Sequence, residues 1–174
     1  GPSAYGLRSV TNAVVLAAGG ARFGGTVGGY TARDLALTYT GSVALPSAQT
    51  PITQRAARTT TFHPGLAGAG KGLALSFQNT AGTAAGTFVL AGTNTYDGRT
   101  TVSGSPDSEN GTLTVNGSLA SGDMEIKTYA TVNGSGTIAF TPGDRIVVQA
   151  NSRLDASTLA FDLTALPGTA ATLV

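Results

Sequence analysis

Apolar and small polar residues alternate with a period of two in many short segments of this chain, and turn-forming residues separate these segments. Residues 87–90 read TFVL, and residues 112–115 repeat the pattern as TLTV. Such alternation is typical of β-strands that bury one face. Helical periodicity is almost absent, so the pattern predicts an all-β protein, with strands at 13–16, 34–39, 72–77, 87–90, 112–115, 124–127, 137–140, 145–149 and 158–163.

Three Asn-Gly pairs punctuate these segments, namely Asn110-Gly111, Asn116-Gly117 and Asn133-Gly134. Both residue types tolerate positive φ, so each pair suits a hairpin of an antiparallel β-sandwich or a corner of a solenoid. Similar segments start at Gly86, Gly111 and Ala130, and their equivalent glycines recur at intervals of about 17 to 25 residues, which favours a β-solenoid.

Composition removes several function classes. Charged residues make up 11% of the 174 residues and the net charge is +1, which gives no field for nucleic acid or anionic lipid. The chain has no cysteine, which excludes disulfides, thiolate metal sites and thiol nucleophiles. The run AVVLAA at 13–18 is far shorter than the ~20 residues of a membrane-spanning helix.

Both ends of the chain suggest an excised fragment. Gly1-Pro2 matches the remnant of a cleaved fusion tag and is left out of the fold prediction. At the other end, residues 171–174 read ATLV and stop inside an apolar, strand-like run.

Three blocks between residues 82 and 138 combine β-forming residues with glycine turns. The first contains Asn94, Thr95, Tyr96, Gly98, Thr100 and Val102, the second Leu113, Val115, Asn116 and Gly117, and the third Gly134, Ser135, Gly136 and Ile138. With these blocks in the family's order, residues 82–138 resemble the passenger-associated repeat of bacterial autotransporters, which are type V secretion proteins. The chain departs from the family at 105–110, where SPDSEN interrupts the repeat, and we expect this insertion to be a surface loop.

The resemblance implies a right-handed parallel β-helix, exported through an outer-membrane barrel at the C-terminus of the same polypeptide. We expect coils of about 20 residues. We expect residues 82–174 to form coils that include the repeat at 82–138. We expect residues 3–81 to be a β-rich N-terminal part, either further coils or a cap, with an irregular excursion at 49–64. The lack of cysteine suits passage through a narrow barrel.

Candidate catalytic residues form no convincing set. His63 is the only histidine, and no serine lies in a Gly-x-Ser-x-Gly turn. Asp123, Glu125 and Lys127 share one face of a predicted strand, which indicates a solvated charged ladder rather than an acid–base pair or a calcium site. Asp107 and Glu109 lie in the inserted loop without a calcium-binding pattern. No catalytic residue, metal or cofactor is predicted.

Two further features have structural interpretations. The glycine-rich string at 17–30 lacks both Gly-x-Gly-x-x-Gly and Gly-Lys-Ser/Thr, and no helix-forming segment follows it, so it indicates tight turns rather than a nucleotide site. Tyr96 precedes Asp97-Gly98, and we expect it to pack at a coil corner rather than to stack on a ligand.

The sequence thus predicts a non-catalytic autotransporter passenger fragment at the bacterial surface or secreted, acting as a stalk or adhesive face. Its partners would be surface proteins or glycans of host or bacterial cells, or a second copy. The alternative is the β-helical tail of an exported enzyme, such as a subtilisin-like protease or esterase, whose catalytic domain lies outside this chain. A third hypothesis is a small polysaccharide-active β-helix enzyme.

Overall fold

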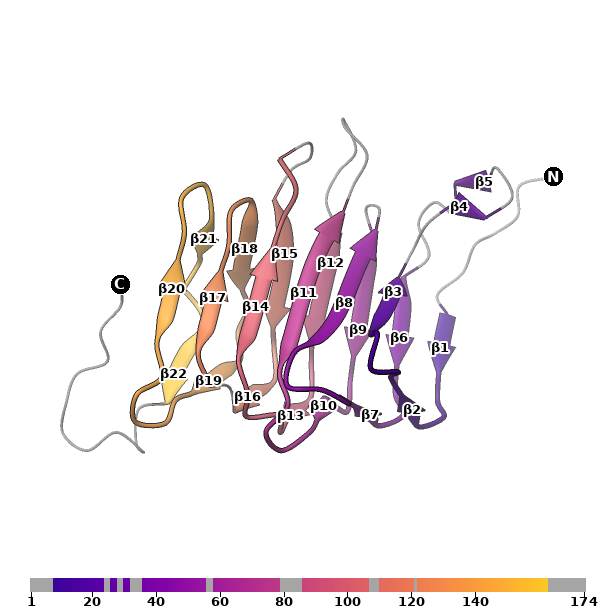
Figure 1. Cartoon of the computed structure of the whole chain (residues 1–174), viewed down its shortest axis with the longest axis horizontal. Coiled ribbons are helices and arrows are strands. Elements are labelled where there is room, and N and C mark those ends of the chain that lie inside the picture. The colour runs from indigo at the N-terminus through magenta and orange to yellow at the C-terminus, as the bar shows by residue number, and fades with distance from the viewer. Residues whose placement is uncertain are drawn as a thin grey trace.

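The computed structural model describes residues 8–23, 26–27, 30–31, 36–55, 58–78, 86–106, 110–120 and 122–162. In this part of the chain every regular element is a β-strand, and every strand pair except one is parallel. The strands wind into a right-handed parallel β-helix whose coils stack along one axis (Figure 1). The predicted β-helix is confirmed, and the alternative antiparallel sandwich is wrong.

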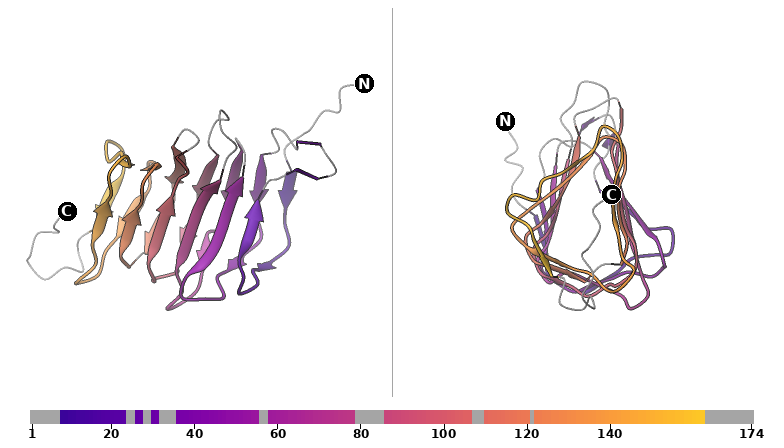
Figure 2. Two further views of the ribbon diagram at one scale, coloured as in Figure 1. Left: turned by 45° about the horizontal axis from the view of Figure 1, so that its top comes forward. Right: turned by 90° about the vertical axis from the view of Figure 1, so that its left-hand side faces the viewer.

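The coils have a triangular cross-section, because each full coil contributes one strand to each of three sides (Figure 2). A seven-stranded sheet forms the first side: β1 (Arg8–Val10), β6 (Leu37–Tyr39), β9 (Thr59–Phe62), β12 (Thr87–Leu90), β15 (Gly111–Val115), β18 (Ala130–Asn133) and β21 (Arg153–Leu154). A six-stranded sheet forms the second: β3 (Ala21–Phe23), β8 (Thr50–Arg55), β11 (Leu73–Gln78), β14 (Thr100–Ser103), β17 (Met124–Ile126) and β20 (Ile146–Val148).

The third side holds two shorter sheets placed one after the other. The first contains β2 (Val14–Val15), β7 (Val43–Ala44) and β10 (Leu66–Ala67), and the second contains β13 (Thr93–Asn94), β16 (Ser118–Ala120), β19 (Thr137–Ala139) and β22 (Ala160–Asp162). The antiparallel exception is the short pair β4 (Thr26–Val27) and β5 (Tyr30–Thr31). The described residues of 8–78 therefore contribute strands to the same three sides as the later coils.

Coil length varies along the stack. Paired residues in successive coils are separated by 19 positions for Gly111 and Ala130 but by 31 positions for Ala21 and Ile52. The predicted value of about 20 fits the shortest coils and is too small for the others. Part of the variation lies in one corner, which has three residues (127–129) between β17 and β18 but seven (104–110) between β14 and β15.

Three local predictions have different outcomes in the structure. The segment 49–64, expected to be irregular, contains the regular strands β8 and β9, so that expectation is wrong. The insertion at 105–110 lies in a coil corner as expected, although its central residues 107–109 are outside the described residues. Asn116-Gly117 occupies a corner between β15 and β16 and not a hairpin turn.

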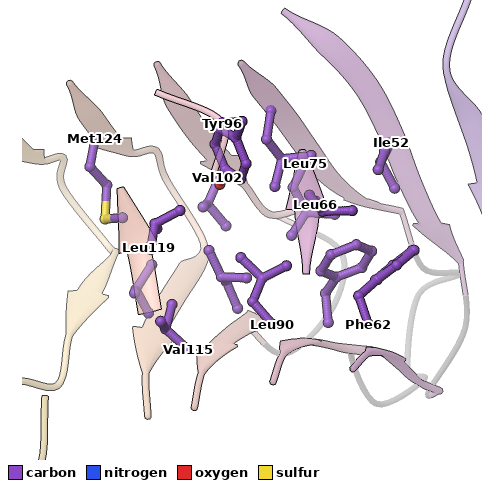
Figure 3. Close-up of a cluster of buried hydrophobic side chains, with 14 of the residues drawn as sticks. Ile52, Phe62, Leu66, Leu75, Leu90, Tyr96, Val102, Val115, Leu119 and Met124 are labelled. Atoms are coloured by element: carbon purple, nitrogen blue, oxygen red, sulfur yellow. The ribbon is translucent and has the colours of Figure 1, made fainter. Parts of the chain in front are cut away.

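The alternating residues fill the interior of the triangle in columns (Figure 3). Phe88, Leu113 and Val132 are paired from coil to coil, and each is 0% exposed. Towards the N-terminal coils an aromatic column follows the same axis, with ring centroids 4.7 Å apart for Tyr39 and Phe62 and 5.0 Å apart for Phe62 and Phe88. Because each coil covers the apolar face of the next, the stack has one continuous core.

Glycines stack at the corner that precedes the third side. A Cβ at Gly117 would overlap the carbonyl oxygen of Gly92 one coil earlier, and a Cβ at Gly136 would overlap that of Gly117. Only a residue without a side chain allows the backbones to approach this closely. The glycines of the repeat pattern are therefore needed for coil-to-coil contact at this corner.

Asn94 joins three coils by its side chain, which is 1% exposed. Its Oδ1 accepts a hydrogen bond from the N–H of Leu66 at 2.8 Å. Its Nδ2 donates to the carbonyl oxygens of Gly92 at 3.0 Å and Ser118 at 2.9 Å. The amide thus bridges the break between the two sheets of the third side. Nearby, Tyr96 is completely buried, which confirms its predicted packing role.

Candidate functional site

A charged cluster lies on the outer face of the six-stranded sheet and is centred on Glu125. Met124 and Ile126 point into the core, so the alternation turns Glu125 outward. Its Oε2 lies 3.1 Å from Nη2 of Arg99 and 3.8 Å from Nζ of Lys127, while Oε1 accepts a hydrogen bond from Nε2 of Gln149 at 2.8 Å. Both carboxylate oxygens are therefore engaged.

This cluster agrees only in part with the predicted ladder of Asp123, Glu125 and Lys127. Glu125 and Lys127 do form an ion pair. Asp123 does not join them, because its Oδ1 accepts a hydrogen bond from the N–H of Arg145 at 3.0 Å and so holds a coil corner. Arg99 and Gln149 were missed by sequence reasoning, since their positions depend on the register between coils of unequal length. The ion pairs are partly exposed and contribute modestly to stability.

His63 lies just after β9, and its side chain is exposed. Its backbone N–H donates to the carbonyl oxygen of Tyr39 at 2.9 Å. Within the described residues its imidazole has no hydrogen-bond or ion-pair partner, so no triad is assembled around it there. Asp107 and Glu109 lie outside the described residues.

The glycine-rich string at 17–30 leads through a turn into β3 and then into the pair β4 and β5. A nucleotide-binding loop requires a helix after the strand, and the described residues of the string are turns and strands. Among the described residues, no group of three or more His, Asp or Glu side chains is placed to hold a metal ion. Over the same residues, no helix has the length and apolarity needed to cross a membrane.

The outer face of the seven-stranded sheet carries two straight rows of mainly hydroxyl side chains. We call these residues, from β6 to β18, the threonine face. One row is built by the pairing of Thr59, Thr87, Thr112 and Thr131. The other contains Thr38, Thr61, Val89, Thr114 and Asn133.

Most hydroxyls of the threonine face are unused by the protein itself. Thr114 Oγ1 donates to Oδ1 of Asn133 at 2.8 Å. In the described part of the chain, no protein hydrogen-bond partner is found for the hydroxyls of Thr38, Thr59, Thr61, Thr87, Thr112 and Thr131. These groups are half-buried or exposed, and each both donates and accepts.

On the six-stranded sheet, by contrast, outward hydroxyls form hydrogen bonds within the protein. The hydroxyls of Thr53 and Ser76 lie 3.2 Å apart, and Ser103 Oγ donates to the carbonyl oxygen of Leu75 at 3.3 Å. This sheet also carries the Glu125 cluster. The signal in the sequence for outward threonines is the spacing Thr-x-Thr at 59–61 and 112–114, because alternate residues of a strand share one face. It did not predict that one side would leave its hydroxyls free.

The chain matches no protein-family model, no curated protein and no solved structure.

Proposed function

We propose that this chain is a non-catalytic part of a bacterial autotransporter passenger, exported across the outer membrane, where it acts as a stalk or an adhesive face. The carrying observation is that the similar segments starting at Gly86, Gly111 and Ala130 occupy equivalent positions in successive coils. Gly92, Gly117 and Gly136 stack at one corner, and Phe88, Leu113 and Val132 stack in the core. A repeat that reads as one coil per unit is what a stalk built by stacking requires.

The proposed partners follow from the surface chemistry. With a net charge of +1 and a rigid, flat, hydroxyl-rich side, the chain suits many weak polar contacts with surface proteins or glycans better than binding of nucleic acid. In the full-length protein, the partner at the C-terminal end would be the outer-membrane barrel.

The test is surface display. The chain is fused behind a signal peptide and ahead of an autotransporter barrel in a laboratory bacterium, and external protease is added to intact cells. We expect a folded, protease-resistant segment on the cell surface, and increased adhesion or clumping of the cells. A matched control carries Leu113→Asp, which places a charge in the core and should be degraded. Retention of the unaltered chain inside the cell overturns the proposal.

Measurements of enzyme activity and of cell adhesion distinguish this proposal from the alternative, in which the chain is the tail of an exported enzyme. If a longer natural chain cleaves peptides or esters and this segment only stabilises its catalytic domain, displayed cells will not adhere. Hydrolysis of any substrate by the purified chain would contradict a non-catalytic role.

A further inference from the structure

The threonine face presents its hydroxyls as a regular two-dimensional array. One row is threonine on four successive strands, and the second row is interrupted at Val89, which has the shape of threonine without the hydroxyl. In the view along the axis the coils lie over one another, so the rows follow the stack (Figure 2). The outward positions, strand by strand, are Thr38, then Thr59 and Thr61, then Thr87 and Val89, then Thr112 and Thr114, then Thr131 and Asn133.

Two distances set the periods of this array. Neighbouring strands of a parallel sheet lie about 4.8 Å apart, and alternate residues of one strand lie about 6.6 Å apart. Direct bonds between hydroxyls need a separation of about 2.7 Å, so threonines in adjacent positions do not satisfy one another. Only the longer side chain of Asn133 reaches its neighbour, Thr114. The other hydroxyls are left for a partner outside the chain.

Crystalline water has nearly the same two periods. In hexagonal ice each oxygen bonds tetrahedrally to its neighbours at about 2.75 Å, which places second-neighbour oxygens about 4.5 Å apart. The repeat along the hexagonal axis is eight-thirds of the bond length, or about 7.3 Å. The prism face of ice contains both of these directions. The periods of the array therefore agree with those of the prism face to within about a tenth.

Threonine side chains have the chemistry and the stiffness that such a lattice requires. A hydroxyl donates one hydrogen bond and accepts up to two, so each can take the place of a lattice water. Branching at Cβ restricts χ1, and the strands beneath are held by parallel pairing on a packed core. The hydroxyls are thus fixed in position before they bind, which keeps the entropy cost of binding low.

The charge distribution also separates the two large sheets. The outward positions from β6 to β18 carry no charged residue, which suits a neutral crystal that excludes ions. Arg99 and Glu125 lie on the six-stranded sheet, where their charges orient water around themselves. The seven-stranded sheet is therefore the side that can continue an ice lattice.

We propose that the threonine face binds ice, by ordering a layer of water that continues the lattice of the prism face. Ice repeats in both directions over the whole face. A sugar chain is a poorer match, because the same outward positions offer no aromatic ring on which it would pack. This activity goes beyond the proposed passenger role and does not depend on export.

The size of the array determines how strong the effect on ice should be. Along the stack, the difference in period sums to about 1 Å over the three steps from Thr59 to Thr131. A short array therefore stays in register with the crystal where a long one would not. The patch measures only roughly 20 Å by 10 Å. We expect it to slow the recrystallisation of ice rather than to lower the freezing point strongly.

The experiment grows ice slowly on a cold surface in a stirred solution of the purified chain. A growing ice front excludes solutes that do not bind to it. We expect the unaltered chain to be enriched in the ice relative to the remaining liquid. Thr112→Tyr places a bulky ring in the uninterrupted row on β15, and it should abolish the enrichment. Tyrosine suits an outward strand position, so the variant should fold.

The matched control is Thr101→Tyr, the same change at a half-buried outward position of the six-stranded sheet. It should enter the ice like the unaltered chain. Circular dichroism and thermal unfolding check each variant, and Thr87→Tyr, in the same row, replaces Thr112→Tyr if that variant is unfolded. The proposal is overturned if the unaltered chain is excluded from ice, or if the two sheets respond equally to the substitution. A negative result here leaves the display test untouched.

Discussion

The hydroxyl of Tyr96 lies 2.9 Å from Oγ1 of Thr100, and both side chains are 0% exposed. The two residues flank the corner that leads from the third side into β14. A buried phenol requires a polar partner, and a threonine four residues later supplies it within the same corner. The pair thus fixes the path of the chain from inside the core.

Replacement of Tyr96 by Phe tests this contact. The ring is kept and only the hydroxyl is lost, so we expect the free energy of unfolding to fall by about 1 kcal/mol. Denaturant unfolding at neutral pH measures it. Tyr129→Phe, at a half-buried position, is the control and should change the free energy by less than half as much. Equal losses in the two variants would contradict a specific role for the buried pair.

Alkaline pH should destabilise the protein through the same residue. Burial raises the pKa of Tyr96 above its ordinary value of 10.0, against the opposing effect of the Thr100 hydrogen bond. Its contribution to stability is fully present below pH 10 and is lost as the pH rises, because the unfolded chain ionises first. Tyr39, whose pKa is also raised by burial, acts in the same direction.

Unfolding at about pH 8 and about pH 11 measures this effect. In Tyr96→Phe the loss of free energy between the two pH values should be smaller than in the unaltered chain. An identical loss would show that Tyr96 does not contribute to the alkaline transition.

Removal of the Asn94 amide should be more costly than a surface change. Asn94→Ala leaves the buried N–H of Leu66 without its partner and removes two further hydrogen bonds to carbonyl oxygens, so we expect a loss of about 2 to 4 kcal/mol in the free energy of unfolding. Asn116→Ala is the matched control, because Asn116 is exposed at the following corner and its Oδ1 accepts long hydrogen bonds, of 3.3 Å and 3.4 Å, from the N–H and the hydroxyl of Ser135. It should cost less than about 0.5 kcal/mol. A small effect at Asn94 would show that water replaces the amide.

Truncation of neighbouring residues in β9 should lower the free energy of unfolding by very different amounts. Phe62 is fully buried between Tyr39 and Phe88, and Phe62→Ala should lower the free energy of unfolding by about 3 to 5 kcal/mol. Thr61 points outward, and Thr61→Ala should change it by no more than about 0.5 kcal/mol. Thermal and denaturant unfolding of both variants decide whether this alternation holds.

The long corner between β14 and β15 should accept a deletion. Without residues 106–109, the corner keeps 104, 105 and 110, three residues, the same length as the corner between β17 and β18. We expect the free energy of unfolding to change by less than about 1 kcal/mol, since loop length has a weak effect on stability. A loss of more than about 2 kcal/mol would show that the insertion packs against the helix.

Each of the nine segments predicted from the alternation of apolar and polar residues overlaps an observed strand, but 13 of the 22 strands in the described residues were not among them. The observed β12 spans the predicted residues 87–90, and β17, β19 and β20 lie within one or two residues of the predictions at their ends. The pairing direction was not decided by this pattern, because Asn-Gly suits both hairpins and corners. The resemblance to a repeat family supplied it.

The strand β8 was missed because it contains a proline and a buried polar residue, which are unusual in a strand. Pro51 discouraged a strand, yet β3 pairs with β8 only from Ile52 onwards, so the missing N–H interrupts no ladder there. Gln54 and Thr60 have polar side chains, so the sequence suggests that they face solvent, but both are buried. Thr60 Oγ1 donates a hydrogen bond to Gln54 Oε1 at 2.8 Å. A buried polar pair of this kind has no signal in single-residue hydrophobicity.

The candidate surfaces were predictable only within one strand. Glu125 and Lys127 share a face because they are two residues apart. The addition of Arg99 and Gln149, and the alignment of four threonines, depend on coil lengths that vary from 19 residues upwards. Nothing in the sequence states these lengths, since the corners that set them are solvent-exposed and tolerate insertions.

The hydrogen bonds of all three sides run parallel to the helix axis, because each strand pairs with those of the coils before and after it. A force along the axis therefore peels one coil from the stack at a time and does not shear many bonds together. Each released coil of 19 to 31 residues extends by about 60 to 110 Å. Under tension the stack of coils therefore lengthens in steps of one coil. A released coil can re-form on the exposed strand edges of the coil that remains.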